Sequence, residues 1–157
     1  TISLGLVKTI NLPTYLVPRY SNYKEFKKTL VASDYHLKSD NFLERIKKWN
    51  LDYNSYIKFL NVKTAIPDNF DEEKAAIIRN FFEEDEARFG FEIEVIESGD
   101  VTHSLLESAY KFDADLLIVM AENQSFLGSL LFKSISKELI LKSDIPILFV
   151  HKDDRVN

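Results

Sequence analysis

The chain has 157 residues, of which 45% are hydrophobic and 29% charged, with a formal net charge of −5 and no cysteine. This balance is typical of one globular domain and excludes a disordered chain, a disulfide framework and a Cys nucleophile. Without a Lys/Arg-rich tract, the acidic charge argues against nucleic acid and membrane partners. No apolar run approaches the roughly 20 residues that cross a bilayer, and no signal peptide is visible, so we expect a cytoplasmic protein.

The first 25 residues contain an apolar, strand-like segment, Thr14 to Val17, that does not fit the start of an αβ alternation. Aligning Pro13 with Pro146 superimposes this segment on Ile147 to Val150, so a proline-led strand occurs twice at about one domain length. We therefore interpret residues 1–18 as the end of a preceding domain. Residues 19–25, which are mostly polar, are then the linker.

From Phe26 onward, short apolar runs alternate with stretches of helical period, a pattern typical of βαβ units and a parallel sheet. This organisation predicts one domain over residues 26–151 and a tail over residues 152–157. The continuous apolar run at 116–120 suits burial on both faces of the sheet. The predicted strands are Thr29 to Ala32, Tyr56 to Val62, Phe91 to Ile96, Leu116 to Met120 and Ile147 to Val150.

Four amphipathic helices are predicted between these strands. The first is short, and the second begins near residues 69–71 and ends before Gly90. Asp100 is the expected N-cap of the third helix, which follows Gly99. The apolar residues that mark the four helices are, in chain order, Phe42, Leu43 and Ile46; Ile77, Ile78, Phe81 and Phe82; Leu105, Leu106 and Ala109; and Leu130, Leu131, Ile135 and Leu139.

Five segments resemble parts of the universal stress protein family in their order and spacing. They are Lys28 to Tyr35, Ile57 to Val62, Gly99-Asp100, Ala114 to Met120 and Ser143 to Val150. The resemblance covers residues 26–150 and implies a stress-response protein with an α/β, three-layer Rossmann-like fold of the adenine nucleotide alpha hydrolase-like type, built on a five-stranded parallel sheet. Because residues 1–17 resemble the tail of a preceding copy, the chain is similar to the second half of a tandem member.

In this family the last strand lies at a sheet edge, where many dimers form by antiparallel contact. The resemblance therefore implies an extra antiparallel edge strand at residues 14–17, paired with Ile147 to Val150 and protecting an apolar edge. The expected partner is the preceding universal stress protein domain or, in a homodimer, a second copy bound through the same edge. Pairing within the chain and exchange between two chains both satisfy this expectation.

ATP-binding members carry a glycine-rich loop after the fourth strand, because backbone N–H groups at a helix N-terminus hold the phosphates and a Cβ would obstruct them. The matching residues 120–135 are about one residue short, and Glu122 adds negative charge. Four other residues stand where the family has glycine: Ala121, Gln124, Phe126 and Lys133. The resemblance thus implies a degenerate loop, no bound cofactor and a non-catalytic domain that acts through domain pairing or dimerisation.

The alternative is a domain that keeps ATP or another adenine nucleotide, with weak or no hydrolase activity. Asp34 and Val62 match family positions at the strand ends, and Ser134 keeps its expected type. In a plainer interpretation Asp34 caps a turn, while Val62 and Met120 fill the core. If a nucleotide binds, its expected contacts are Asp34, Val62, Met120, Ala121, Lys133 and Ser134. A third alternative is another nucleotide-binding α/β family, such as the electron-transfer flavoproteins.

No catalytic or metal-binding residue is predicted. The three histidines lack ligand spacing, and Asp100, His103 and Ser104 lie on one helical turn, where they cannot converge on a substrate. The acidic run at residues 83–86 is interpreted as a solvated helix face. Three aromatic residues are interpreted as packing or an interface: Trp49, Tyr53 and Tyr56.

Overall fold

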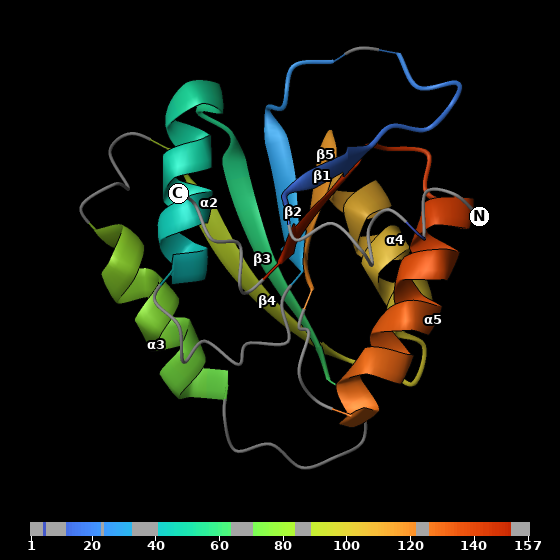
Figure 1. Ribbon diagram of the computed structural model, residues 1–157. Coiled ribbons are helices and arrows are strands. Elements are labelled where there is room, and N and C mark those ends of the chain that lie inside the picture. Colours follow the sequence, from blue (N-terminus) through green and yellow to red (C-terminus); the bar gives the residue numbers. More distant parts are fainter. Residues whose placement is uncertain are drawn as a thin grey trace.

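A six-stranded sheet with the order β1-β6-β5-β2-β3-β4 forms the middle layer of the protein (Figure 1). The computed structural model describes residues 5, 12–22, 24–32, 41–63, 71–83, 89–121 and 126–151. The strands are β1 (Thr14–Leu16), β2 (Lys28–Ala32), β3 (Tyr56–Lys63), β4 (Phe91–Glu97), β5 (Leu116–Ala121) and β6 (Ile147–His151). Strands β2 to β6 pair in parallel and β1 pairs antiparallel to β6, which confirms the predicted fold class.

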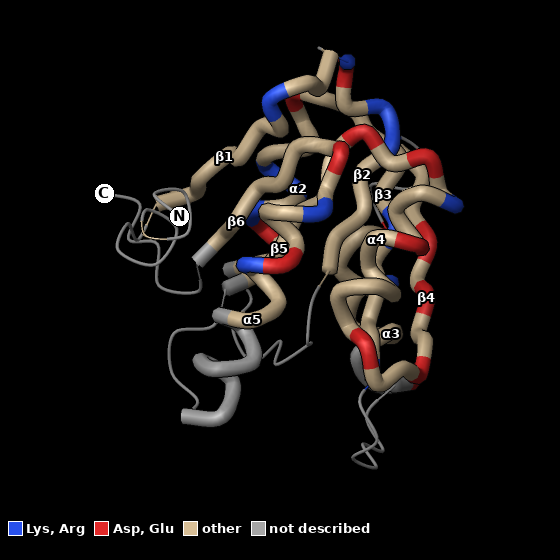
Figure 2. Tube along the Cα trace, turned by 90° about the vertical axis from the view of Figure 1, so that its right-hand side faces the viewer, with Lys and Arg blue, Asp and Glu red and all other residues tan. Residues whose placement is uncertain are grey.

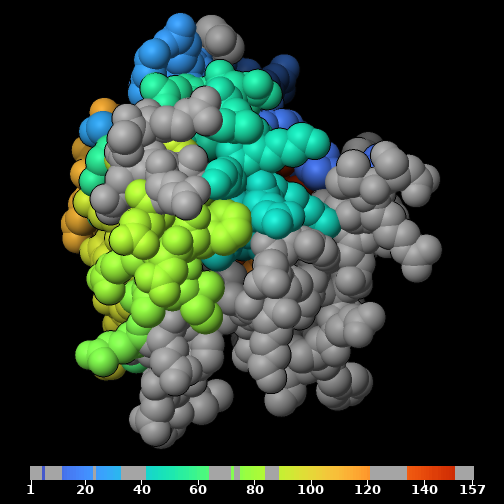
Figure 3. Space-filling view, turned by 90° about the vertical axis from the view of Figure 1, so that its left-hand side faces the viewer, coloured from blue at the N-terminus to red at the C-terminus, as the bar shows by residue number. Residues whose placement is uncertain are grey.

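In the described part of the chain, two helices cover each face of the sheet, which gives three layers (Figure 1). They are α2 (Asn41–Tyr53), α3 (Asp71–Phe82), α4 (Val101–Phe112) and α5 (Phe126–Lys142). Helices α2 and α3 form neighbouring parts of one surface (Figure 3), and the Lys47 ammonium of α2 lies 5.6 Å from the centre of the Phe81 ring of α3. Among the helices that the structure describes, none combines the length and the apolar character of a membrane span.

The core is divided by the sheet, as the alternation of strand side chains requires. In β5, Ile118 and Met120 pack toward α2 and α3, whereas Leu117 and Val119 pack toward α4 and α5. Both sets are almost fully buried. The continuous apolar run of β5 therefore serves two cores, one on each face, as the sequence predicts for a central parallel strand.

One helix length differs from the prediction. Helix α2 continues to Tyr53, because Asn54 adopts a left-handed conformation with φ of 50° and donates its N–H to the Asn50 carbonyl at 2.8 Å. Asparagine tolerates this conformation and ends helices well. Helix α3 begins at Asp71 and ends at Phe82, before Gly90, as the sequence predicts. The N-cap prediction for α4 is confirmed, since the Asp100 carboxylate accepts from the His103 N–H at 2.9 Å.

The two outer strands of the sheet differ in character. Strand β4 carries three acidic side chains along its length, Glu92, Glu94 and Glu97 (Figure 2). Charged side chains on an outer strand discourage edge-to-edge pairing with other molecules. Strand β1 has no charged residue. It is held by its pairing with β6 and by a hydrogen bond between Tyr15 and Trp49 of α2.

Candidate functional site

The carboxyl ends of the parallel strands define the place where an open α/β sheet binds ligands. From β2 the chain builds β3 and β4 on one side, then crosses to place β5 and β6 on the other side. The strand order therefore reverses between β2 and β5, whose paired residues run up to Ala32 and Val119. Asp34 follows this point in sequence and lies outside the described residues, as do residues 122–125 of the expected phosphate loop.

Val62 and Met120 are each near the carboxyl end of a strand, but on opposite faces of the sheet. Val62 of β3 is partly buried and packs with the α4 and α5 core. Met120 of β5 is 8% exposed and packs with the α2 and α3 core. Strand β2 lies between the two strands. Both side chains therefore contribute to the core, and a ligand that contacted both would have to lie across the end of the sheet.

The remaining predicted contacts lie in β5 and α5. Ala121 is the last residue of β5 and pairs with His151. Lys133 and Ser134 are adjacent residues of α5, and the Ser134 side chain is exposed to solvent. A surface hydroxyl of this kind is available to a ligand. The binding roles of all these residues remain predictions.

Among the described residues, no group of three or more His, Asp or Glu side chains is arranged to hold a metal ion. Of the residues with triad composition, Asp100 caps α4, His103 is exposed and Ser104 is buried. Asp100 and His103 are thus linked through a backbone N–H, which is a helix-capping contact and leaves the imidazole outside the interaction.

The outer edge of β6 is occupied by β1. Thr14, Tyr15 and Leu16 pair with Phe149, Leu148 and Ile147, respectively. This confirms the predicted antiparallel edge strand within a single chain. The strand ends at Leu16 rather than at Val17. Beyond this point along β6, the Ile145 N–H bonds to the Ser143 hydroxyl at 3.3 Å instead of continuing the ladder to β1.

Four aromatic residues hold β1 against the domain; we call them the aromatic clamp: Tyr15, Phe26, Trp49 and Tyr53. The rings of Tyr15 and Phe26 stack with their centres 6.3 Å apart, and those of Trp49 and Tyr53 stack at 4.6 Å. Trp49 Nε1 donates to the Tyr15 phenol oxygen at 2.8 Å. Burial raises the pKa of Tyr15 above its usual value, and the bond from Trp49 offsets this only in part.

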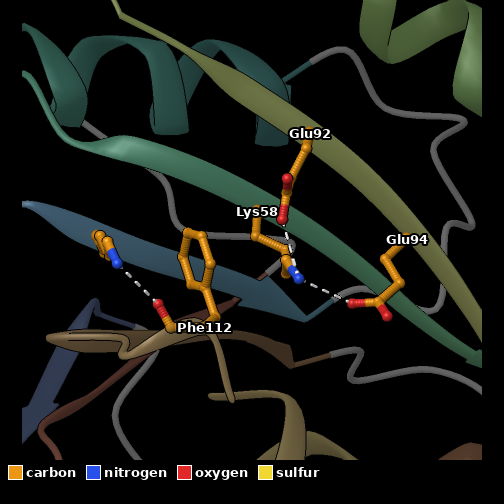
Figure 4. A network of polar contacts seen from close by, with 5 residues as sticks. Lys58, Glu92, Glu94 and Phe112 are labelled. Carbon is orange, nitrogen blue, oxygen red and sulfur yellow. Dashed lines mark hydrogen bonds and ion pairs between the residues drawn. The ribbon is translucent and has the colours of Figure 1, made fainter. Parts of the chain in front are cut away.

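Tyr56 is not part of the aromatic clamp. It lies on the other face of the sheet, where its ring centre is 6.0 Å from that of Phe112. Beside them the Lys58 ammonium bonds to Glu92 at 2.9 Å and to Glu94 at 3.0 Å and lies 5.0 Å from the centre of the Phe112 ring (Figure 4). The only sequence signal for this network is the alternation of acidic residues in β4 opposite Lys58.

Comparison with known proteins identifies a family. The model of the universal stress protein family matches residues 25–151. Among curated relatives, the stress response protein NhaX of Bacillus subtilis is 39% identical over 59 residues, which are 38% of this chain and 35% of NhaX. The match to the family model favours the universal stress proteins over the electron-transfer flavoproteins, the alternative that the sequence left open.

Solved structures of the same family share the fold. A universal stress protein from Archaeoglobus fulgidus superposes with a TM-score of 0.75 at 17% identity, over 98% of this chain and 55% of that one. A universal stress protein in complex with cAMP superposes with a TM-score of 0.60 at 19% identity, over 83% of this chain and 100% of that one. The chain thus spans about half of the first protein, and about a third of NhaX.

Proposed function

The chain belongs to the universal stress protein family, and we propose that it forms the second domain of a tandem stress-response protein, acting through domain pairing and not through catalysis or ATP binding. The single observation that carries this proposal is the register of β1 on β6. Aligning Pro13 with Pro146 makes Tyr15 equivalent to Leu148, and these two residues are direct partners in the sheet. In the same alignment Thr14 is equivalent to Ile147 and Leu16 to Phe149. In the sheet the pairing is crossed, since Thr14 pairs with Phe149 and Leu16 pairs with Ile147.

Such a register is what two equivalent strands adopt about a two-fold axis. In an isologous contact the same segment of each partner meets its own counterpart in reverse order. A strand that pairs by chance has no reason to place the equivalent residues opposite one another, because a shift of one residue would break the relation. The register therefore supports the interpretation of residues 1–18 as the end of a preceding, homologous domain.

The length relation supports the same proposal. This chain, with β1 included, superposes on about half of the longer Archaeoglobus fulgidus protein. A chain of one domain preceded by a short piece of another would cover a two-domain relative in this way. A second copy of the chain can use the β6 edge only by displacing or exchanging β1, because β1 already pairs with it.

The absence of ATP binding is proposed from the loop sequence. Phosphates need close backbone N–H groups, and Ala121, Gln124, Phe126 and Lys133 each place a Cβ where ATP-binding members have glycine. The second candidate function is binding of an adenine nucleotide, which the complex of a structural neighbour with cAMP favours. Titration calorimetry with ATP and with cAMP separates them, since submillimolar binding of either supports the second candidate.

Deleting Thr1–Pro18 tests the pairing proposal. Loss of β1 exposes the β6 edge, so we expect a new dimer or lower solubility by size-exclusion chromatography with light scattering. A synthetic peptide of residues 1–18 should restore the monomer. The same peptide with Thr14→Pro and Leu16→Pro, which cannot pair, is the matched control. A deleted chain that stays monomeric and soluble, with unchanged hydrogen exchange in β6, would remove the basis of the proposal.

A further inference from the structure

A cavity of about 490 Å³ lies at the amino ends of the parallel strands, at the opposite end from the expected nucleotide contacts. One wall is formed by the end of β1 and by the loop that joins β1 to β2, drawn in blue at the top of Figure 1. The other wall is formed by residues 114–115 before β5 and residues 144–146 before β6. A volume of this size falls in the range of small-molecule sites, roughly 300–1,000 Å³.

The walls of the cavity are fixed in place by named bonds. The Asp115 carboxylate accepts from the Lys27 and Lys28 N–H groups at 3.1 and 3.0 Å. The Ser143 hydroxyl donates to the Ile145 carbonyl at 2.8 Å and accepts from the Ile145 N–H at 3.3 Å, which holds the turn before β6. Tyr15 is held by the aromatic clamp. A site with walls held in this way needs little reorganisation when a ligand binds.

The lining combines aromatic rings with charged side chains of both signs. Tyr15, Tyr20 and Phe26 supply the aromatic side chains, and the charged residues of the lining are Asp115, Asp144 and Lys24. Within the described part of the chain, Asp144 makes no ion pair. Aromatic faces and carboxylates are the groups that together attract organic cations.

The chain itself shows a cation on one of these rings. The guanidinium carbon of Arg19 lies 5.6 Å from the centre of the Tyr20 ring. Tyr20 is 87% exposed, so most of its aromatic surface is in solvent. A ligand cation at the rim of the cavity would take the place of the Arg19 guanidinium on this ring.

We propose that this cavity is a binding site for a small organic monocation, an ammonium group carried on an apolar or aromatic body. The apolar body packs among Tyr15, Phe26 and the apolar residues before β6, and the ammonium lies near Asp144 and Tyr20. The Lys24 ammonium on the same lining disfavours a polyamine, because a second positive charge would be repelled. The site lies at the opposite end of the strands from the expected nucleotide contacts, and two of its lining residues, Tyr15 and Val17, belong to the segment proposed to end a preceding domain.

Phenethylamine, protonated at neutral pH, is a suitable probe, and 2-phenylethanol is its neutral counterpart of the same shape. We expect calorimetry to detect binding of phenethylamine. In NMR spectra, the ligand should shift the backbone amide signals of residues 20–26 and 144–146. Asp144→Asn should weaken binding about tenfold, since it removes the charge near the ammonium. Tyr20→Ala should weaken it about twofold to fivefold.

Two matched variants control for general effects. Tyr110 is also 87% exposed but lies on α4, so Tyr110→Ala should leave binding unchanged. Asp52 is an exposed carboxylate of α2 away from the cavity, and Asp52→Asn should also have no effect. Amide shifts elsewhere, or no binding, would overturn the site. Equal binding of 2-phenylethanol, or unchanged binding by Asp144→Asn, would overturn the preference for a cation.

Discussion

The indole Nε1 of Trp49 donates a hydrogen bond of 2.8 Å to the phenol oxygen of Tyr15, which ties α2 to β1. Strand β1 has only three residues, a length that gives little stability by itself. The contact therefore supplies β1 with an anchor that the strand ladder does not provide. The side chain of the neighbouring residue, Leu16, packs on the other face with the α4 and α5 core, so β1 is held from both faces of the sheet.

Trp49→Phe should loosen β1 without unfolding the domain. The substitution removes the indole N–H but keeps an aromatic ring beside Phe26 and Tyr53. We expect a loss of about 1 kcal/mol in the free energy of unfolding and faster hydrogen exchange at residues 14–16. Tyr110→Phe, which alters a phenol in solvent, is the control and should change neither. Unchanged exchange in β1 would show that the indole bond does not anchor the strand.

The phenol of Tyr15 should give this contact an alkaline limit. Burial raises its pKa above the usual value of 10.0, so the folded state keeps the proton more firmly than the unfolded chain does. The stability gained is complete below the unfolded pKa and is lost as the pH rises through the folded pKa. Tyr15→Phe cannot ionise, and its free energy of unfolding should fall less than that of the wild type between about pH 9 and about pH 11. If the free energies of unfolding of the wild type and of Tyr15→Phe changed equally over this pH range, the prediction would be wrong.

Lys58→Met should destabilise the protein by about 1–2 kcal/mol. Lys58 is 15% exposed and bonds to Glu92 and Glu94. Partial burial works to lower its pKa, but the two carboxylates outweigh it and hold the pKa above its usual range. Methionine keeps the apolar stem and leaves the carboxylates without their cation. Chemical denaturation measures the loss, and Glu92→Gln with Glu94→Gln in the same chain should recover part of it.

Lys111→Met is the matched control for Lys58. Lys111 pairs with Glu107 at 2.8 Å one helical turn away, but both side chains are largely in solvent. An exposed pair of this kind contributes roughly 0.3–0.5 kcal/mol. If the two methionine variants lost equal stability, the network around Phe112 would be no more than a surface ion pair.

The strands were predictable because their signals are local. The runs at 116–120 and 147–150 are continuously apolar, which is the composition that burial on both faces of a sheet favours. The Asp100 cap was predictable for the same reason, since a cap acts within one turn. Each parallel strand is one residue longer than predicted, which is the usual uncertainty at an element's end.

The contacts that join distant elements were not predictable from local pattern. Nothing in the residues around Tyr15 indicates that its phenol meets Trp49, since the meeting depends on the order of the strands and on where α2 lies over them. In the same way, Tyr56 separates from Trp49 and Tyr53 because strand alternation turns it to the opposite face, toward Phe112. At the carboxyl ends of the strands, the sequence identified the expected nucleotide contacts, but it did not show that Val62 and Met120 face opposite cores.

Leu117→Asp should prevent folding. Leu117 is 0% exposed in a central strand and packs toward α4 and α5, so an unpaired carboxylate there carries a large desolvation cost. Leu117→Ala, a milder change, should lower the free energy of unfolding by about 2–5 kcal/mol. Leu141→Ala is the control on α5, where the side chain is 62% exposed. A normal melting temperature for Leu117→Asp would be incompatible with this position in the core.

Glycine at two positions of the loop after β5 should not restore ATP binding. Gln124→Gly and Phe126→Gly remove two of the four Cβ atoms that we expect to obstruct the phosphates, but Ala121 and Lys133 remain, and the loop is still expected to be about one residue short. Each phosphate oxygen needs a backbone N–H within hydrogen-bond distance, which a shorter loop cannot supply by flexibility alone. We expect no calorimetric binding of ATP below millimolar concentration for the wild type or the double variant. Submillimolar affinity in the double variant alone would show that these two side chains are the whole obstacle.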